Sequence, residues 1–381
     1  MRTLSLSVAC SAILTALAAH TGNIPISKYA GPVKPNSYII KLKNTAHKDL
    51  HLADLRSSTP GFKVTHAYTE AFHGYAAELE DSALEYVRRS REVEFIAEDG
   101  IVGLDYEISE DTSEMKPIVG PVGQMHMSTR TDGAGVDIYS LDTGIQINHT
   151  SFGARASWGK TFGGYVDADY NGHGTHTAAT AVGDSYGVAT SSNIIAVKVL
   201  GDNGLGQWSD IIAGIDYVIA QSAQSGRPSI ATLSLSGFIY VPADMAVTAA
   251  IAKGIHFTVA AGNLGTDASG SSPAHVELAN TIGAVDIHNV RAGFSNFGPS
   301  VDGWALGVDV TSAWIGTSGK ETKVLSGTSM ATPFVAGVLA VAIGDYGNKS
   351  PVNLSKDLKN HARPVVTGAP NGTTNLLVAQ W

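Results

Sequence analysis

The order of apolar and polar positions divides the chain into two patterns. Short runs that alternate between apolar and polar residues predict strands at 37–43, 62–68, 72–79 and 93–102. An amphipathic helix is predicted from 81 to 93, with Asp81 as its N-cap. From about Val136 the apolar runs become continuous and alternate with helical segments. The first pattern indicates a small α+β unit, and the second indicates an α/β domain.

The second pattern is typical of a sheet that is buried on both faces. Strands are predicted at 136–142, 193–200, 229–236, 255–263 and 280–285, and helices at 172–183, 209–223 and 242–254. Continuous apolar strands alternating with helices predict a mostly parallel, doubly wound sheet with helices on both faces. In such sheets, binding sites form at the carboxyl ends of the strands.

The N-terminal segment carries the features of a signal peptide. Arg2 precedes an apolar stretch that ends in small residues, so we expect residues 1–19 to direct secretion. Cys10, the single cysteine, lies within it, so the mature protein would contain no disulfide. An acidic segment without apolar periodicity follows the α+β unit and predicts an exposed linker. We therefore divide the chain into a signal (1–19), an N-terminal domain with linker (20–116) and a large domain (117–381).

Composition narrows the classes of partner. The formal net charge is −9, and no basic run interleaved with aromatic residues appears, which argues against nucleic acid. No stretch after the signal is predicted to cross a membrane. We expect a secreted monomer that has neither a nucleic-acid nor a membrane partner.

Four polar residues stand where predicted strands end or helices begin. Asp142 ends a strand, His173 begins a helix, Asn263 ends another strand, and Ser329 lies in the first turn of a long helix. A serine hydroxyl needs a base such as histidine, and the histidine needs a carboxylate on its other nitrogen. An amide side chain and a backbone N–H at a helix N-terminus can stabilise an oxyanion. The set predicts a serine nucleophile with its catalytic partners.

Each motif also has a simpler interpretation, and rival sites exist. The residues could be strand ends and helix caps, and the histidine pair of "HGTH" could bind metal, although a glutamate between them is lacking. "GDSYG" fits the nucleophile elbow of esterases around Ser185, but no apolar strand precedes it. An inactive protease used as a binding module is a further alternative.

Taken together, these motifs resemble the subtilisin-like serine proteases, specifically the secreted fungal branch around proteinase K. The resemblance rests on "SLDTG", "NGHGTHTAA", "VAAGN" and "LSGTSMATPFVAG" and covers most of residues 135–381. It implies that Asp142 orients His173, that His173 is the base, that Ser329 is the nucleophile and that Asn263 is the oxyanion donor. It also implies that the N-terminal domain is an inhibitory propeptide, which makes the protein a zymogen.

The resemblance further implies a substrate cleft. Two segments would clamp an extended peptide: the first is Gly204, Leu205, Gly206, Gln207 and Trp208, and the second is Ser234, Leu235, Ser236 and Gly237. A third segment would form the pocket wall for the residue before the scissile bond, and it consists of Ala260, Ala261 and Gly262. Apolar walls imply a preference for hydrophobic or aromatic residues with broad tolerance. Family members often digest external or host protein, including keratin and cuticle.

The chain departs from the family pattern at several positions. Phe334 replaces a histidine after the proline of "TSMATP", and we interpret it as a packing substitution. Ser236 replaces a glycine of the second clamp, where its side chain could crowd the substrate backbone. The chemistry requires no cofactor. The resemblance places a structural calcium ion at Asp302, with carbonyls near Glu277 and Ala279; a simple turn aspartate is an equal alternative.

Four sequons agree with secretion and predict glycan attachment at Asn148, Asn348, Asn353 and Asn371.

Overall fold

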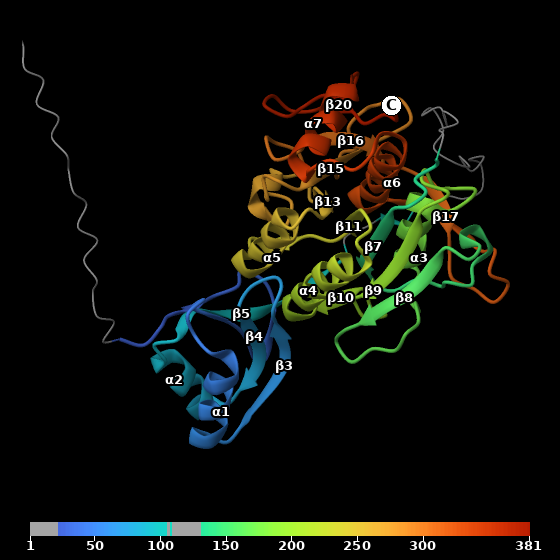
Figure 1. Cartoon of the computed structure of the whole chain (residues 1–381). Helices are drawn as coiled ribbons and strands as arrows, with labels where there is room; N and C mark the ends of the chain where they lie inside the picture. The colour runs from blue at the N-terminus through green and yellow to red at the C-terminus, as the bar shows by residue number, and fades with distance from the viewer. Residues whose placement is uncertain (1–21, 105–106, 109–130) are drawn as a thin grey trace, which may run out of the picture.

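The computed structural model describes residues 22–104, 107–108 and 131–381 (Figure 1). The predicted signal segment with Cys10, most of the acidic linker and the expected boundary at 116 lie outside the described residues. The described chain forms a small N-terminal domain and a large domain.

The N-terminal domain is an α+β unit built on one sheet. Its strands follow the order β1-β5-β2-β4-β3, and its elements are β1 (Ile26–Ser27), β2 (Val33–Leu42), α1 (Lys48–Ser58), β3 (Phe62–Tyr68), β4 (Gly74–Leu79), α2 (Asp81–Arg89) and β5 (Val93–Gly103). Strand β2 shows how both faces of this sheet are buried. Ile40 packs in the cluster under the two helices, whereas its neighbour Ile39 points into the contact with the large domain.

The large domain contains a nine-stranded sheet that is parallel except at one edge. The order is β19-β20-β16-β15-β13-β11-β7-β9-β8, and only the β19–β20 pair is antiparallel. The strands are β7 (Asp137–Asp142), β8 (Ala156–Thr161), β9 (Asn193–Lys198), β11 (Ser229–Leu233), β13 (His256–Ala260), β15 (Asn280–Val285), β16 (Gly303–Leu306), β19 (Arg363–Pro364) and β20 (Leu376–Leu377).

Helices cover both faces of this sheet. One face packs against α4 (Trp208–Ser225) and α5 (Val241–Ala252), and the other packs against α3 (His173–Val182) and α6 (Thr328–Tyr346). The predicted doubly wound α/β domain, preceded by an α+β unit, is therefore confirmed. Helix α7 (Pro351–His361), two 3-10 turns at Thr150–Phe152 and Ala268–Gly270, and six short strands complete the described chain: β6 (Glu107–Ile108), β10 (Leu205–Gln207), β12 (Gly237–Phe238), β14 (Ser271–Ser272), β17 (Val310–Ala313) and β18 (Thr322–Ser326).

Helix α6 differs from the expectation that no stretch after the signal is long and apolar enough to cross a membrane. It has 19 residues, and an 18-residue window within it has a mean hydropathy of 1.4, so the helix meets that criterion by length and composition. However, 89% of this window is buried inside the protein, so α6 is the central core helix of the large domain.

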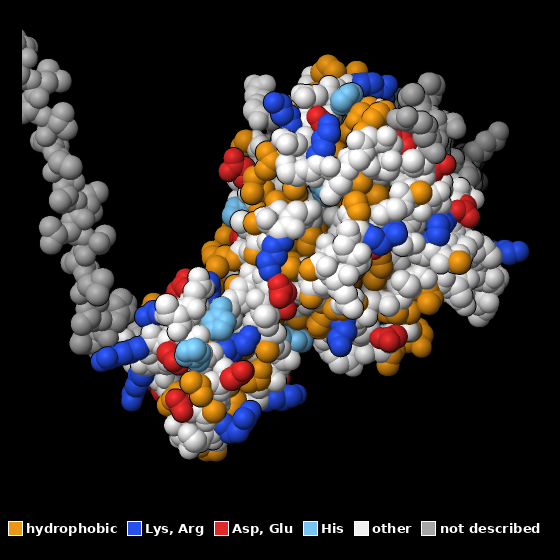
Figure 2. Space-filling view, in the orientation of Figure 1, with side chains coloured by type: hydrophobic (Ala, Val, Ile, Leu, Met, Phe, Trp, Pro, Cys, Tyr) orange, Lys and Arg blue, Asp and Glu red, His pale blue; other side chains and the backbone are white. Residues whose placement is uncertain are grey.

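Helix α4 receives the N-terminal domain (Figure 1). Asp99 of β5 is fully buried and accepts hydrogen bonds from the backbone N–H (2.9 Å) and hydroxyl (2.7 Å) of Ser209, at the start of α4. Two turns further along α4, Oδ1 of Asp216 accepts from three successive backbone N–H groups of residues 69–71, at 2.9, 2.7 and 2.7 Å. His66 Nε2 lies 2.7 Å from Asp210 Oδ1. Each domain therefore supplies carboxylates that bind the other: Asp99 from the N-terminal domain, and Asp210 and Asp216 from α4. On the face shown in Figure 2, acidic and basic side chains are interspersed over both domains.

Loss of the Asp216 carboxylate should loosen this contact. In Asp216→Ala, three N–H donors lose a charged acceptor, and we expect a loss of roughly 1–3 kcal/mol of docking free energy. Hydrogen exchange of the full chain should then be faster at residues 69–71. Asp286→Ala is the matched control, because Asp286 accepts two backbone N–H bonds in a turn of the large domain itself. Unchanged exchange at residues 69–71 would contradict the assigned role.

Candidate active site

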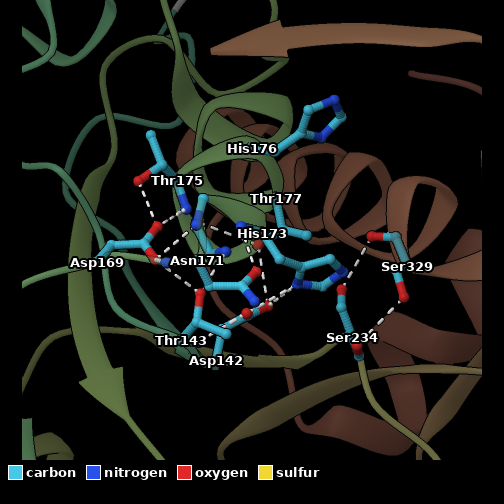
Figure 3. A network of polar contacts seen from close by, with 12 residues as sticks. Asp142, Thr143, Asp169, Asn171, His173, Thr175, His176, Thr177, Ser234 and Ser329 are labelled. Carbon is cyan, nitrogen blue, oxygen red and sulfur yellow. Dashed lines mark hydrogen bonds and ion pairs between the residues drawn. The ribbon is translucent and has the colours of Figure 1, made fainter. Parts of the chain in front are cut away.

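The four predicted residues meet at the carboxyl edge of the parallel sheet. Asp142 ends β7, and Asn263 follows the end of β13. His173 is the first residue of α3, and Ser329 is the second residue of α6. Figure 3 shows the imidazole of His173 lying between the Asp142 carboxylate and the Ser329 side chain. The edge rule for parallel sheets therefore brings together residues that are up to 187 positions apart in sequence.

Asp142 and His173 form a buried hydrogen-bonded pair. Nδ1 of His173 lies 2.8 Å from Oδ1 and 3.0 Å from Oδ2 of Asp142. The carboxylate also accepts from the backbone N–H of Thr143 (2.7 Å) and the hydroxyl of Thr177 (3.1 Å). A carboxylate on Nδ1 favours the tautomer that carries the proton there, which leaves Nε2 as the basic nitrogen.

Ser329 is held at the start of the core helix. Its hydroxyl donates to the carbonyl oxygen of Ser234 at 3.2 Å, and the Ser234 hydroxyl donates back to the Ser329 carbonyl at 2.9 Å. This pair joins the end of β11 to the first turn of α6. A rotation about the Cα–Cβ bond of Ser329 can redirect the hydroxyl, and catalytic hydrogen bonds commonly tighten only when substrate is bound.

Asn263 is oriented by the residue before Ser329. Its Oδ1 accepts from the backbone N–H (2.8 Å) and the hydroxyl (2.9 Å) of Thr328. These bonds fix the amide plane, so its Nδ2 donor faces away from Thr328. Together with the backbone N–H of Ser329 at the N-terminus of α6, this arrangement can stabilise developing negative charge.

The two predicted clamp segments hold a strand of the chain itself. β10 pairs antiparallel with the end of β5, and Gly103 forms an antiparallel bridge with Ser236. The N–H of Leu104 donates to the carbonyl of Gly204 at 3.1 Å. Beyond Ser329, β6 pairs antiparallel with Leu325 and Ser326 of β18. Two residues of the expected linker, Glu107–Ile108, thus form a strand.

The remaining predicted cleft residues are mostly buried. Trp208 is fully buried and stacks on Tyr240, with ring centroids 5.5 Å apart. Ser236 still pairs with the propeptide strand, because the residue opposite it is Gly103, which has no side chain. The predicted pocket wall is apolar and buried, and it comprises Ala260, Ala261 and Gly262. Gln207 N-caps α4, and Leu235 is buried in the core between β11 and Gly237.

Calcium does not fit the residues at Asp302. The Nζ of Lys359 lies 2.5 Å from Oδ1 of Asp302, and the N–H of Thr281 donates to Oδ2 at 2.8 Å. Both oxygens therefore already bind donors, one of which is a cation. Burial raises the pKa of the Asp302 carboxyl, and Lys359 opposes that effect. Among the described residues, no group of three or more His, Cys, Asp or Glu side chains is placed to hold a metal.

Two other predicted features are also placed. Ser185 lies exposed in a turn directly after α3, where no strand precedes it, so the elbow geometry of an esterase is absent there. Phe334 lies in the apolar cluster between α3 and α6, which agrees with a packing role.

Several residues of the site were missed by sequence reasoning. Thr143 and Thr177 hydrogen-bond to Asp142, and the buried Asp169 binds the start of α3. Thr143 and Thr177 belong to the quoted motifs, but a motif does not show that the N–H of Thr143 and the hydroxyl of Thr177 donate to Asp142. Asp169 stands in an irregular loop, where no periodicity marks it.

His176 is a second histidine of α3 with a different environment. It is fully buried, its Nε2 lies 3.1 Å from the carbonyl oxygen of Val310 and 3.2 Å from that of Lys323, and burial lowers its pKa to about 3. The ring is therefore neutral, and its Nε2–H donates hydrogen bonds to these two carbonyl oxygens. This structural role disfavours the metal-binding interpretation of the "HGTH" pair.

Comparison with known proteins identifies the family. The family model described as "Subtilase family" matches residues 133–377, and the model "Peptidase inhibitor I9" matches residues 37–105. The chain belongs to the subtilase family. It is a serine endopeptidase that carries an inhibitor-type propeptide domain at its N-terminal side.

Relatives of this subtilase include proteases from fungi. It is 38% identical to "Subtilisin-like protease 2" of Pseudogymnoascus destructans, over 90% of this chain and 82% of that protein. It is 34% identical to "Alkaline protease 2" of Aspergillus fumigatus, over 94% of this chain and 84% of that protein. The solved structure of a cold adapted subtilisin-like serine proteinase matches with a TM-score of 0.62 and 40% identity, over 66% of this chain and 91% of that one.

Neutral burial of His176 should make the subtilase sensitive to acid. The unfolded chain takes up a proton on this imidazole below pH 6.5, whereas the folded state stays neutral down to about pH 3. Stability should therefore fall by about 1.4 kcal/mol per pH unit from this residue as the pH drops through that window. Melting temperatures of the full-length Ser329→Ala chain between pH 3.5 and 6.5 measure the slope.

The comparison uses two substitutions in that background. His176→Gln should show a shallower slope, and His288→Gln, which removes an exposed imidazole, should keep the parental slope. Equal slopes in all three proteins would show that His176 contributes nothing to the acid sensitivity.

The ion pair of Lys359 with Asp302 should stabilise the large domain. In Lys359→Gln a largely buried carboxylate loses its cation, and we expect a loss of about 1 kcal/mol, or roughly 2–4 °C in melting temperature. Lys356→Gln on the same helix is the control and should melt with the parent. Calorimetry of the Ser329→Ala background checks this, and equal melting of both variants would contradict the assignment.

Proposed function

We propose that this subtilase is a secreted endopeptidase, made as an inactive precursor, that hydrolyses extracellular proteins with Ser329, His173, Asp142 and Asn263. One observation carries the proposal. Strand β5 of the propeptide domain pairs with β10 of the first predicted clamp, and β6 pairs with β18, which ends three residues before Ser329. An extended peptide added as a strand to the clamp segments is the binding mode expected for a protein substrate.

The proposed chemistry follows from the geometry of these residues. His173 Nε2 takes the proton of the Ser329 hydroxyl as the oxygen attacks the scissile carbonyl. Asp142 stabilises the resulting imidazolium, and the Asn263 amide with the Ser329 N–H stabilises the oxyanion. His173 then protonates the leaving amine, and water hydrolyses the acyl-enzyme by the same route. Because the base must be neutral, activity should be neutral to alkaline; the name "Alkaline protease 2" of a relative agrees with this.

The proposed specificity rests on the walls of the cleft. The small apolar segment Ala260–Gly262 supports a preference for hydrophobic or aromatic residues before the scissile bond, with broad tolerance. We propose that the natural substrates are external proteins, which include host proteins such as keratin or cuticle. The four sequon asparagines are exposed and are proposed glycan sites: Asn148, Asn348, Asn353 and Asn371.

We further propose that the precursor cuts itself between Leu104 and Glu107. Gly103 and Leu104 pair with the clamp segments, and Glu107 pairs with Ser326 beyond the nucleophile. We therefore expect the cleaved bond to be one of the three peptide bonds from 104 to 107. This junction lies before the boundary at 116 that the acidic linker predicts.

Mass analysis of the protein recovered from culture medium tests these proposals. The mature chain should begin at residue 105, 106 or 107, and a serine-reactive phosphonate should label it at Ser329. The Ser329→Ala chain should keep its propeptide covalently attached and take up no label. Ser185→Ala should mature and hydrolyse peptides like the parent. A parent that takes up no label at Ser329 would overturn the catalytic proposal and favour an inactive binding module.

A further inference from the structure

Asp169 collects five donors from both sides of the catalytic pair (Figure 3). Its Oδ1 accepts from the Thr143 hydroxyl (3.0 Å) and from the backbone N–H groups of Asn171 (3.1 Å) and Gly172 (2.8 Å). Its Oδ2 accepts from the backbone N–H (3.0 Å) and hydroxyl (2.6 Å) of Thr175. Since every partner donates, the site requires a side chain that accepts on both oxygens.

The five donors come from two segments that carry catalytic residues. Thr143 directly follows Asp142 at the end of β7, whereas residues 171–175 surround His173 at the start of α3. The Thr143 hydroxyl also accepts from the N–H of Gly174 at 2.9 Å, so it bridges the carboxylate and the helix. Asp169 thus joins the segment of the carboxylate to the segment of the base.

The two segments approach too closely for loose packing. A Cβ at Gly174 would lie 2.1 Å from the carbonyl oxygen of Gly144, so the helix start rests directly on the loop after β7. From the other side, the buried Lys198 donates to the carbonyl of Thr143 at 2.5 Å. Thr143 is therefore held at its hydroxyl and at its carbonyl, and Asp169 connects that hydroxyl to Thr175 of α3 through its two oxygens.

We infer that Asp169 is a positioning residue of the active site, which fixes the distance and angle between the Asp142 carboxylate and the His173 imidazole. It acts through these two side chains and is assigned no step of the reaction. This inference rests on the proposed role of Asp142, His173 and Ser329. A displacement of catalytic groups by about 1 Å can cost roughly a hundredfold in rate, so this carboxylate should govern the chemical step and leave substrate binding intact.

The test is Asp169→Asn, which keeps the size but replaces one acceptor with a donor that faces the N–H of Thr175. Rates on a peptide amide substrate are divided by the concentration of active sites, which phosphonate titration measures, so that misfolded protein does not lower the apparent kcat. We expect kcat to fall by roughly 30- to 100-fold while KM changes less than about threefold. The far-downfield NMR signal of the proton between His173 and Asp142 should shift or broaden.

Asp137→Asn is the matched control. Asp137 is also buried and hydrogen-bonded, to Asn193 and Arg227, but it begins β7 at the opposite edge of the sheet. Its substitution should lower the melting temperature and change kcat less than about twofold. If Asp169→Asn lowers stability in the same way but keeps parental kcat per titrated site, the inference is wrong.

A second pair covers the case in which Asp169→Asn fails to mature. Thr143→Val removes the bridging hydroxyl and Thr143→Ser keeps it, so the serine variant should retain at least about tenfold more kcat than the valine variant. Equal kcat in the two would overturn the inference. A parent without phosphonate label would instead refute the proposed function, so the two failures are distinguishable.

Discussion

The hydrogen bond between the Asp142 carboxylate and the His173 imidazole is the interaction on which the site depends. Both side chains are buried, so water can neither solvate their charges nor orient them. Protein groups replace water here: a backbone N–H and a threonine hydroxyl donate to Asp142, and the start of α3 positions His173. The active site is therefore a property of the parallel sheet edge and of two segments packed against each other, because single residues could not supply this orientation.

The same edge explains how one chain is both enzyme and inhibitor. β5 of the propeptide domain binds with backbone hydrogen bonds to β10, in the way a peptide substrate would. Its docking, however, depends on Asp99 of β5, which accepts from Ser209 at the start of α4, and on Asp216 of α4, which accepts from the propeptide backbone. The contacts that dock the domain are thus separate from the strand pairing in the clamp.

Much of this arrangement could be predicted from the sequence, and the failures have physical causes. Continuous apolar strands ended by Asp142 or followed by Asn263 predicted the sheet, and its edge brought these residues together as expected. Helix α1 was missed because its apolar residues are few and it is mostly exposed. β6 was missed since a two-residue strand carries no period. The pairing of Asp302 with Lys359 joins residues 57 positions apart, and no local pattern encodes it.

Two histidines three residues apart on α3 show how environment decides function. His176 has its Nε2 bonded to two carbonyls in a fully buried site, so its pKa falls to about 3 and it remains neutral. His173 faces a carboxylate, which stabilises the imidazolium form that proton transfer requires. A charged ring at 176 would oppose that imidazolium by like-charge repulsion. Neutral burial of the second histidine therefore keeps a second positive charge away from the first, and the small residues of α3 that permit this close packing are part of the same constraint.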